Sequence, residues 1–232
     1  MKIDASRALG AYAAVATCAA IWFALVGAAP GSTRRFEIID VQRINVRETD
    51  GTLRMVIAGN DRIGGLIIGD TEYPHPGRTE AGVIFYNDEG TENGGLVFGG
   101  GLVNGRPTNT GHLSFDRWRQ DQTLYFQSTE DGDRRRAGVF VLDRPDQPLD
   151  PSRAAEVQAM PDGPAKLEAA QAAGFGGSPR AFLGRDFDNS SQLVLRDAQG
   201  RPRLRLRVQA DGAAAIEFLS ENGAVTRTVS AN

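Results

Sequence analysis

The feature that most limits the folds this chain can adopt is a series of short runs in which apolar and polar residues alternate. Each run is followed by a turn sequence. The clearest runs lie near the C-terminus, at residues 192–196, 203–208, 215–219 and 224–229. Asp-x-x-Gly, Asp-Gly and Asn-Gly sequences separate them, and such residues favour the tight turns that join antiparallel strands. Alternation in the second run predicts that Leu204, Leu206 and Val208 face inward while the arginines between them face solvent. Glu217 on the following strand is then placed to pair with one of those arginines.

The same succession of strand, turn and strand recurs earlier in the chain. Strands are expected at 36–46, 53–57, 83–86, 96–98, 112–115, 123–126 and 137–142. The alternation changes phase within 36–46, which indicates a bulge or a bend. Two of these runs, 83–86 and 96–98, are apolar on both faces, as in a central strand or a strand between two layers. The fold class that follows is mainly β, with antiparallel hairpins in a sandwich- or barrel-like meander.

Residues 144–178 differ from the rest and form a proline-rich helical insert or linker. Asp150 is placed to cap a helix with Pro151 at its first position, running to about Met160. A second short helix is expected from residue 164 to residue 173 and would end at Gly174.

Residues 8–29 are apolar and free of charged side chains. A helix of that length reaches about 33 Å, which is enough to cross a bilayer core of about 30 Å. We therefore expect a single-pass transmembrane helix, with the lipid bilayer, such as the bacterial inner membrane, as its partner. A cleaved signal peptide remains the alternative, because Lys2 and Arg7 precede the segment and Val26-Gly27-Ala28 offers a cleavage site. The chain would then be exported.

The charges around this segment leave its orientation open. More arginines follow the segment than basic residues precede it, which places the remaining chain in the cytoplasm by the positive-inside rule. A short basic start before a long apolar stretch is also typical of bacterial proteins with exported domains. The only cysteine, Cys18, lies within the segment, so the residues after it form no internal disulfide. Small residues at Ala16, Ala20, Ala24 and Ala28 would permit weak self-association through the anchor.

Composition and length set the remaining limits. The chain has 232 residues and a formal net charge of −3. Dedicated nucleic-acid binders are usually strongly basic, so no nucleic-acid partner is expected. The predicted organisation is an anchor at 1–33, a β-hairpin region at 34–143, the insert at 144–178 and a C-terminal antiparallel meander at 179–232.

Candidate functional residues gather at the ends of two predicted hairpins. A binding site is expected among Asp88, Glu89, Asp116, Trp118, Arg119 and Asp121. Asp116 and Asp121 form an alternative site, the carboxylate pair of a polysaccharide hydrolase, with Trp118 as a sugar platform. His75 and His112 lack the spacing of metal ligands, and neither an EF-hand nor a phosphate-binding loop is present. The sequence therefore assigns no catalytic residue, no metal and no cofactor.

Two segments carry a resemblance to known proteins. The stretches FYNDEGTENGGLVFGG (85–100) and GHLSFDRWRQDQ (111–122) resemble those of uncharacterised, N-terminally membrane-anchored bacterial proteins that are rich in β-strand. This resemblance implies a bacterial envelope protein and brings no activity with it. We expect a membrane-tethered, non-enzymatic binding or structural module, with a protein or glycan partner at the hairpin ends. The polysaccharide-acting hydrolase is the alternative.

Overall fold

The computed structural model describes residues 5–27, 33, 35–69, 71–75 and 77–230. The chain divides into two units, residues 1–40 and residues 41–232. The first unit contains helix α1, Ala5–Gly27. Residues 28 and 29, at the end of the predicted anchor, lie outside the described residues, as does Ala28 of the predicted cleavage site. Within the described part of the chain, no helix meets the length and apolarity needed to cross a membrane.

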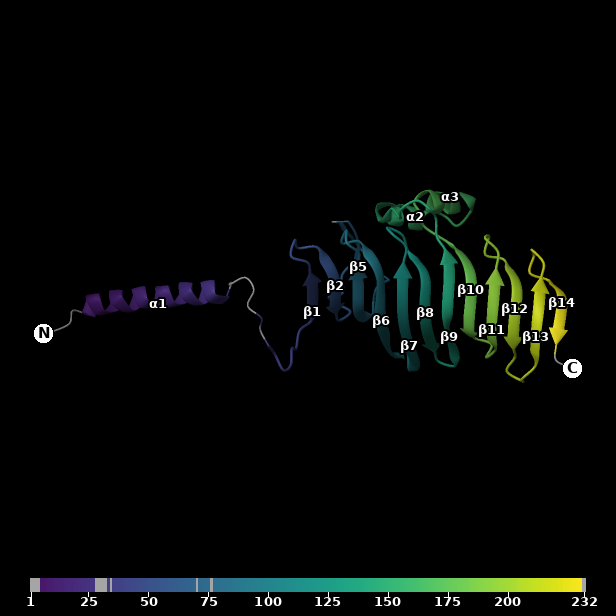
Figure 1. Ribbon diagram of the computed structural model, residues 1–232, viewed down its shortest axis with the longest axis horizontal. Coiled ribbons are helices and arrows are strands. Elements are labelled where there is room, and N and C mark those ends of the chain that lie inside the picture. Colours follow the sequence, from purple (N-terminus) through teal and green to yellow (C-terminus); the bar gives the residue numbers. More distant parts are fainter. Residues whose placement is uncertain (1–4, 28–32, 34, 70, 76, 231–232) are drawn as a thin grey trace. The chain divides into compact units, whose positions relative to one another are not determined.

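The second unit is built on one antiparallel sheet of twelve strands (Figure 1). The sheet follows the chain, because each strand pairs with the next one except where the small β3–β4 hairpin is inserted between β2 and β5. The strands of the large sheet are β1 (Arg43–Arg47), β2 (Leu53–Ala58), β5 (Ala81–Tyr86), β6 (Glu92–Val103), β7 (Arg106–Asp116), β8 (Gln122–Asp131), β9 (Arg134–Asp143), β10 (Ser178–Arg185), β11 (Ser191–Arg196), β12 (Pro202–Val208), β13 (Ala214–Leu219) and β14 (Val225–Ser230). The hairpin consists of β3 (Leu66–Ile68) and β4 (Thr71–Tyr73).

This architecture confirms the mainly β, antiparallel fold and corrects its finer form. The alternating pattern predicted a sandwich or barrel, whereas the twelve strands form one open sheet with β1 and β14 at its edges. Strands from both sides of the insert belong to that sheet, because β9 pairs directly with β10. The first strand is also shorter than expected. It begins at Arg43, and the apolar residues Phe36, Ile38 and Val41 before it are exposed outside any strand.

A five-residue turn recurs between paired strands and explains the spacing of the sequence pattern. Because the strands alternate in direction, five of its seven copies lie at one end of the strands, which we call the turn end, and the copies beginning at Asp186 and Gln209 lie at the other. In each copy, the N–H of the first residue donates to the carbonyl of the fifth, and the N–H of the fourth donates to the carbonyl of the first. Seven turns share this pattern, beginning at Glu48, Asn87, Arg117, Asp186, Asp197, Gln209 and Ser220. In six of the seven, the fourth residue is a glycine or asparagine with positive φ, a conformation that these residues adopt readily.

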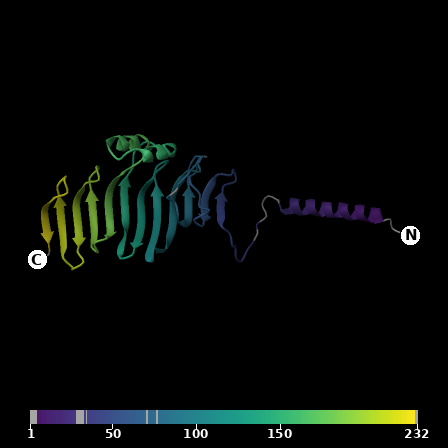
Figure 2. The ribbon, with the colours of Figure 1, turned by 180° about the vertical axis from the view of Figure 1, so that it is seen from behind.

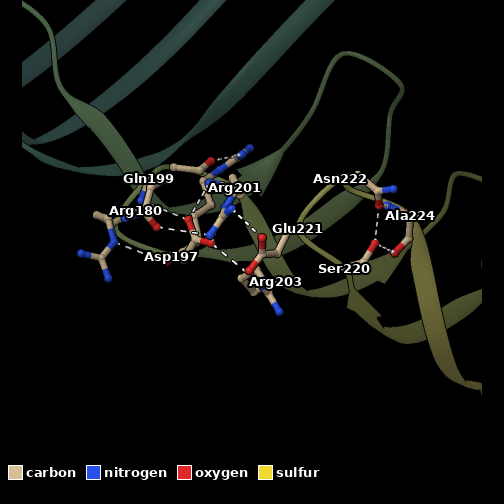
Figure 3. Close-up of polar contacts among 11 residues, drawn as sticks. Arg180, Asp197, Gln199, Arg201, Arg203, Ser220, Glu221, Asn222 and Ala224 are labelled. Carbon is tan, nitrogen blue, oxygen red and sulfur yellow. Dashed lines mark hydrogen bonds and ion pairs between the residues drawn. The ribbon is translucent and has the colours of Figure 1, made fainter.

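Asp and Asn side chains close these turns by accepting backbone hydrogen bonds. Figure 3 shows two of them in the C-terminal region. The Asp197 carboxylate accepts from the backbone N–H groups of Gln199 and Arg201, both at 3.0 Å. In the neighbouring turn, the Asn222 side-chain oxygen accepts from the Ala224 N–H at 3.2 Å. Such side-chain turns depend on local sequence alone, which is why they are predictable.

The two faces of the sheet differ in what covers them. One face packs against the β3–β4 hairpin and the loop before it, and this packing forms the core of the second unit. The core residues are Leu53, Val56, Ala58, Ile63, Ile84 and Tyr86, with Ile67 and Val97 against them. They belong to β2, β5, β6 and the inserted hairpin, so the core lies at the N-terminal end of the sheet.

The C-terminal strands show a further correction. Leu206 and Val208, predicted to face inward, are 39% and 48% exposed, because no second layer covers their face. The arginines lie on the other face, where the predicted pair with Glu217 is confirmed by a distance of 2.5 Å from Arg205 Nε to Glu217 Oε2.

The insert carries the predicted helices. A 3-10 turn, Pro151–Arg153, follows Asp150, whose carboxylate accepts from the Ser152 N–H. Helix α2, Ala154–Ala159, continues from it, and α3 spans Pro164–Ala172. Figures 1 and 2, which view the sheet from opposite sides, both place the two helices beyond the ends of the neighbouring strands β8 and β9.

Candidate functional site

A cavity of about 320 Å³ opens at the turn end of the sheet, between the β3–β4 hairpin and the insert. Strand β6 contributes Glu92, the end of β7 contributes Asp116, and the following turn contributes Arg119 and Asp121. Apolar walls come from Leu66 and Ile68 on the hairpin and from Leu149 and Phe175 in the insert. The cavity therefore combines a charged floor with apolar sides, as small-molecule sites commonly do.

A buried ion pair lies at the base of this cavity. Arg78 Nη2 and Glu92 Oε1 are 2.5 Å apart, and both side chains are only 9% exposed. Arg78 also donates from Nη1 to the Gly65 carbonyl at 2.7 Å, which fixes it against the loop before β3. Burial raises the pKa of the Glu92 carboxyl, against the opposing effect of Arg78. The second carboxyl oxygen of Glu92, Oε2, is buried and has no hydrogen-bond partner among the described residues.

Asp116 is the most strongly perturbed carboxyl group of the site. Burial, with the nearby charges of Glu92 and Asp121, raises its pKa to about 7, while Arg144 and Arg78 act in the opposite direction. Its Oδ1 is also buried without a hydrogen-bond partner in the described part of the chain. Near neutral pH this group therefore exists in both protonation states, so it is able to accept or donate a proton.

The insert closes one side of the cavity through contacts with the turn that follows β7. Gln120 Nε2 donates to the carbonyls of Gln147 and Gly174, at 3.0 and 2.8 Å. Arg144 pairs with Asp121 at 3.0 Å and donates from Nε to the Gln122 carbonyl at 2.6 Å. These contacts hold the insert against the strand ends.

That turn departs from the other six copies in its backbone. Its positive φ, 47°, falls on Arg119, one position earlier than in the others, and Arg119 is neither glycine nor asparagine. The Arg119 carbonyl accepts from the Leu149 N–H at 2.8 Å, so the altered turn binds the insert directly. An unusual backbone conformation beside a cavity is typical of functional sites.

Gly174 lets the insert approach this closely. It has a φ of +77°, and a Cβ there would lie 2.6 Å from the Pro148 carbonyl oxygen. Any other residue would have to shift this part of the insert.

A second, smaller cavity of about 200 Å³ adjoins the first and shares Arg78, Glu92 and Gln122 with it. His112 lines this second cavity, and its Nε2 is buried with no partner among the residues described. Burial lowers the pKa of its imidazole, which favours the neutral form. Tyr86, in the core beneath, likewise has a hydroxyl that is buried and unpaired within the described chain. Burial raises the pKa of that phenol to about 12.

The structure brings together only part of the predicted binding set. Asp116, Arg119 and Asp121 line the cavity, whereas Asp88, Glu89 and Trp118 do not. Asp88 forms an exposed ion pair with Arg54.

Glu89 and Trp118 form a separate bridge between the two neighbouring turns. Glu89 accepts from Trp118 Nε1 at 2.9 Å and from Arg119 Nε at 2.8 Å, and these bonds lower the pKa of its carboxyl. The Arg119 guanidinium also lies over the Trp118 ring, 4.8 Å from its centre. Trp118 thus stands outside the cavity that holds the two aspartates.

Sequence reasoning missed the buried pair and the arginine of the insert. Arg78 follows the proline-containing stretch 73–77, which resembles an exposed loop, and Arg144 begins the proline-rich insert, where the sequence predicts no side-chain partner. The one available signal was Glu92, a carboxylate four residues before Leu96 in the apolar run 96–98. No group of three or more His, Cys, Asp or Glu side chains within the described residues is arranged to hold a metal ion.

A comparison with protein-family models finds none that matches this chain, and a comparison with characterised proteins finds no match either.

Proposed function

We propose that the protein is a membrane-tethered binding module whose ligand site is the cavity between the β3–β4 hairpin and the insert. The observation that carries this proposal is the pair of unpartnered carboxyl oxygens, Glu92 Oε2 and Asp116 Oδ1. Buried polar atoms without partners are costly, so a ligand that donates hydrogen bonds to them would bind favourably. The apolar walls favour a ligand that also has a hydrophobic face.

A terminal sugar of a glycan has both features, because its hydroxyl groups donate hydrogen bonds and its ring carries C–H faces. Asp116 and Glu92 would accept from the hydroxyls, and the Arg119 guanidinium at the rim would donate to ring or hydroxyl oxygens. A glycan of the bacterial envelope is the ligand class that this combination fits best.

The binding test fills the cavity without altering its charges. Ala154 lines the cavity, whereas its neighbour Ala155 does not. We expect Ala154→Trp to weaken glycan binding by at least about tenfold, roughly 1.4 kcal/mol, with Ala155→Trp as the matched control. Isothermal titration with hits from a glycan array measures both. Equal binding by the two variants would place the ligand elsewhere.

A polysaccharide hydrolase is the second candidate, favoured by one observation, the raised pKa of Asp116 in a cavity that also contains Asp121. The two functions separate under Asp116→Asn. A binding module would still bind the glycan in this variant, with an affinity at most moderately reduced because the asparagine amide keeps one oxygen acceptor, and would release no product in either form. If the protein is a hydrolase, the wild type should release reducing sugar from the polysaccharide and Asp116→Asn should not. Asp88→Asn, at an exposed position, is the control and should release as much as the wild type.

The tether is the other half of the proposal. Residues 8–29 would span the inner membrane: the support is the sequence alone, which supplies a stretch free of charged side chains and as long as a bilayer core requires, with residues 28 and 29 outside the described helix. The full-length protein should then stay in the membrane fraction after alkaline carbonate washing, and a reporter fused after Asn232 should identify the side. Release into the soluble fraction, or a mature protein that starts near residue 28, would contradict the tether.

A further inference from the structure

The face of the sheet opposite the core carries an uninterrupted row of apolar side chains. Successive register pairs place one apolar residue from every strand on this row. Its members, in order across the sheet, are Ile44, Ile57, Val83, Leu96, Leu113, Phe126, Val139, Leu183, Leu193, Leu206, Ile216 and Val229. We call the face that they occupy the apolar face.

A second row lies two residues along each strand on the same face. It includes Val46, Met55 and Phe85 at one end and Leu195, Leu204 and Phe218 at the other, and it ends on Arg227. Many of these side chains are open to solvent in the single chain, including Leu183 at 56% and Phe126 at 46%. This face of the sheet is thus left without a covering layer in the single chain.

The size of this face exceeds what isolated proteins expose. Twelve strands at a spacing of about 4.8 Å and a band four residues tall give roughly 55 by 13 Å, or about 700 Å². Soluble monomers rarely expose contiguous apolar patches above about 300–600 Å². Two copies packed through the face would together bury about 1,400 Å², within the range of about 1,200–2,000 Å² for specific interfaces.

Chemistry favours a second copy over a membrane surface as the covering layer. Surfaces that lie in lipid headgroups combine apolar residues with a rim of lysine and arginine. Arg227 lies on this face in the second row and Arg185 lies two residues beyond Leu183, and two separate charges do not form such a rim. Arg135, at the end of the face away from the turn end, is paired with Glu130 at 3.0 Å. A face with so few charges is complementary to a second copy of itself and stacks on another sheet at about 10 Å.

The centre of the apolar face is also uneven, so that side chains of two facing copies could interdigitate there. A shallow hollow of about 380 Å³ is lined by Leu96, Leu113, Phe126 and Val139 and bordered by Phe98. Phe98 is 61% exposed and its ring lies over Gly111, whose missing side chain makes room for it. An exposed aromatic ring at the border of a hollow gives two facing copies side chains and space that can interdigitate.

We propose that two copies of this chain pack face to face through the apolar face, so that the open sheet becomes one layer of a two-chain β-sandwich. This interface lies on the side of the sheet away from the core and does not depend on the ligand proposed for the cavity.

The first test measures the oligomeric state of the full-length protein in nanodiscs by light scattering and native mass spectrometry. We expect a dimer, and we expect Phe126→Lys or Leu183→Lys to weaken it by about 100-fold or more, because each buries an unpaired charge. Thr228→Lys, on the opposite face of β14, is the control and should leave the dimer intact. Unchanged far-UV circular dichroism in all three variants would show that the sheet itself is retained.

A second measurement separates this interface from association through the anchor. In a Cys18→Ser background, Phe126→Cys near the centre of the sheet should cross-link between copies with a short bifunctional maleimide, and Thr228→Cys should not. A dimer that survives both lysine substitutions without cross-linking would assign association to the anchor and overturn the proposal. A monomeric wild type would also overturn the proposal. In that case, protection of the thiol of Phe126→Cys from a water-soluble maleimide would indicate that lipid covers the apolar face.

Discussion

The two ends of the sheet use the same strand and turn unit but differ in what lies on top of it. At the N-terminal end, β2, β5 and β6 are covered on one face by the β3–β4 hairpin, and Val56 and Ile84 are almost fully buried there. At the C-terminal end, no inserted hairpin or helix of the described chain packs on strands β11 to β14. Their Leu206, Ile216 and Phe218 are 38–42% exposed on the apolar face, much as Ile57 and Phe85 are on that face at the N-terminal end.

Polar groups follow the same division. The covered end holds the buried Arg78–Glu92 pair and carboxyl oxygens without partners, whereas the C-terminal end holds ion pairs at its surface, such as Arg201–Glu221 (Figure 3). Identical local structure therefore produces a site only where inserted segments exclude water. The predictions below compare matched residues at the two ends.

The largest difference in the loss of stability is expected between substitutions of two arginines, each of which pairs with a glutamate. Arg78→Met leaves Glu92 buried and unpaired, which should cost about 3–5 kcal/mol of the free energy of unfolding. Arg205→Met removes the partner of Glu217 at the C-terminal end and should cost about 1 kcal/mol or less. Chemical denaturation at pH 8 measures both losses. Equal losses would mean that the Arg78–Glu92 pair is no more shielded from water than the Arg205–Glu217 pair.

The second comparison removes the same side chain from both ends. Ile84 is 2% exposed in the core and Ile216 is 38% exposed on the apolar face. Ile84→Ala should cost about 2–5 kcal/mol, because it leaves a cavity that the neighbours fill only in part, and Ile216→Ala about 1 kcal/mol. A cost at Ile216 that rises with protein concentration would sharpen the comparison, since it would indicate that a second copy covers that face.

The third comparison concerns pH. The pKa of Asp116 is about 7 in the folded protein against 3.8 when unperturbed, so the folded state binds more protons between these values. Stability should therefore be greatest below about pH 4 for this group and fall as pH rises to about 7, by at most about 1.4 kcal/mol per pH unit. Asp116→Asn should flatten this slope in denaturation curves recorded across the range.

Asp188, in the turn between β10 and β11, should behave in the opposite way. Hydrogen bonds from Ser190 lower the pKa of its carboxyl. Its contribution to stability is therefore present at neutral pH and is lost as pH falls through that lowered value. If Asp116→Asn and Asp188→Asn changed the dependence of stability on pH in the same direction, the predicted opposite effects of the buried and the turn carboxylate would be wrong.

The smallest difference in the loss of stability is expected between substitutions of two turn residues. Asn87 accepts from the N–H groups of Glu89 and Thr91 at the covered end, and Asn222 accepts from that of Ala224 at the C-terminal end. Asn87→Ala and Asn222→Ala should each cost about 1 kcal/mol, the ordinary contribution of a hydrogen bond. Thermal unfolding should give nearly equal losses, and a much larger loss at Asn87 would show that the covering hairpin depends on that turn.

Sequence reasoning succeeded where structure is set by neighbours along the chain. The turns were predictable because Asp, Asn and glycine at fixed offsets accept or permit the necessary backbone geometry. Both short helices were predictable from Asp150 with Pro151 and from Gly174 after the second helix. The predicted start of the first strand was wrong, because Phe36 and Ile38 look like strand residues but have no partner strand.

The candidate site was only half predictable. Asp116 and Asp121 drew attention through their residue types, and they do line one cavity. Arg78 reaches Glu92 across a separation of fourteen residues, and Arg144 reaches Asp121 from the insert. Such contacts require the folded positions of the hairpin and the insert, which no local pattern encodes.

The sequence by itself determined most of the strands, the turns between them and their order in a meander, because hydrogen bonding between successive antiparallel strands needs only short-range signals. It did not predict the β3–β4 hairpin, strand β10 (Ser178–Arg185) or the turn that follows β10. Tertiary structure alone decided which face became a core, which carboxyl groups lost their water and which apolar side chains stayed exposed. The physical reason is that alternation makes one face of a strand apolar, whereas burial depends on what other segments pack against that face.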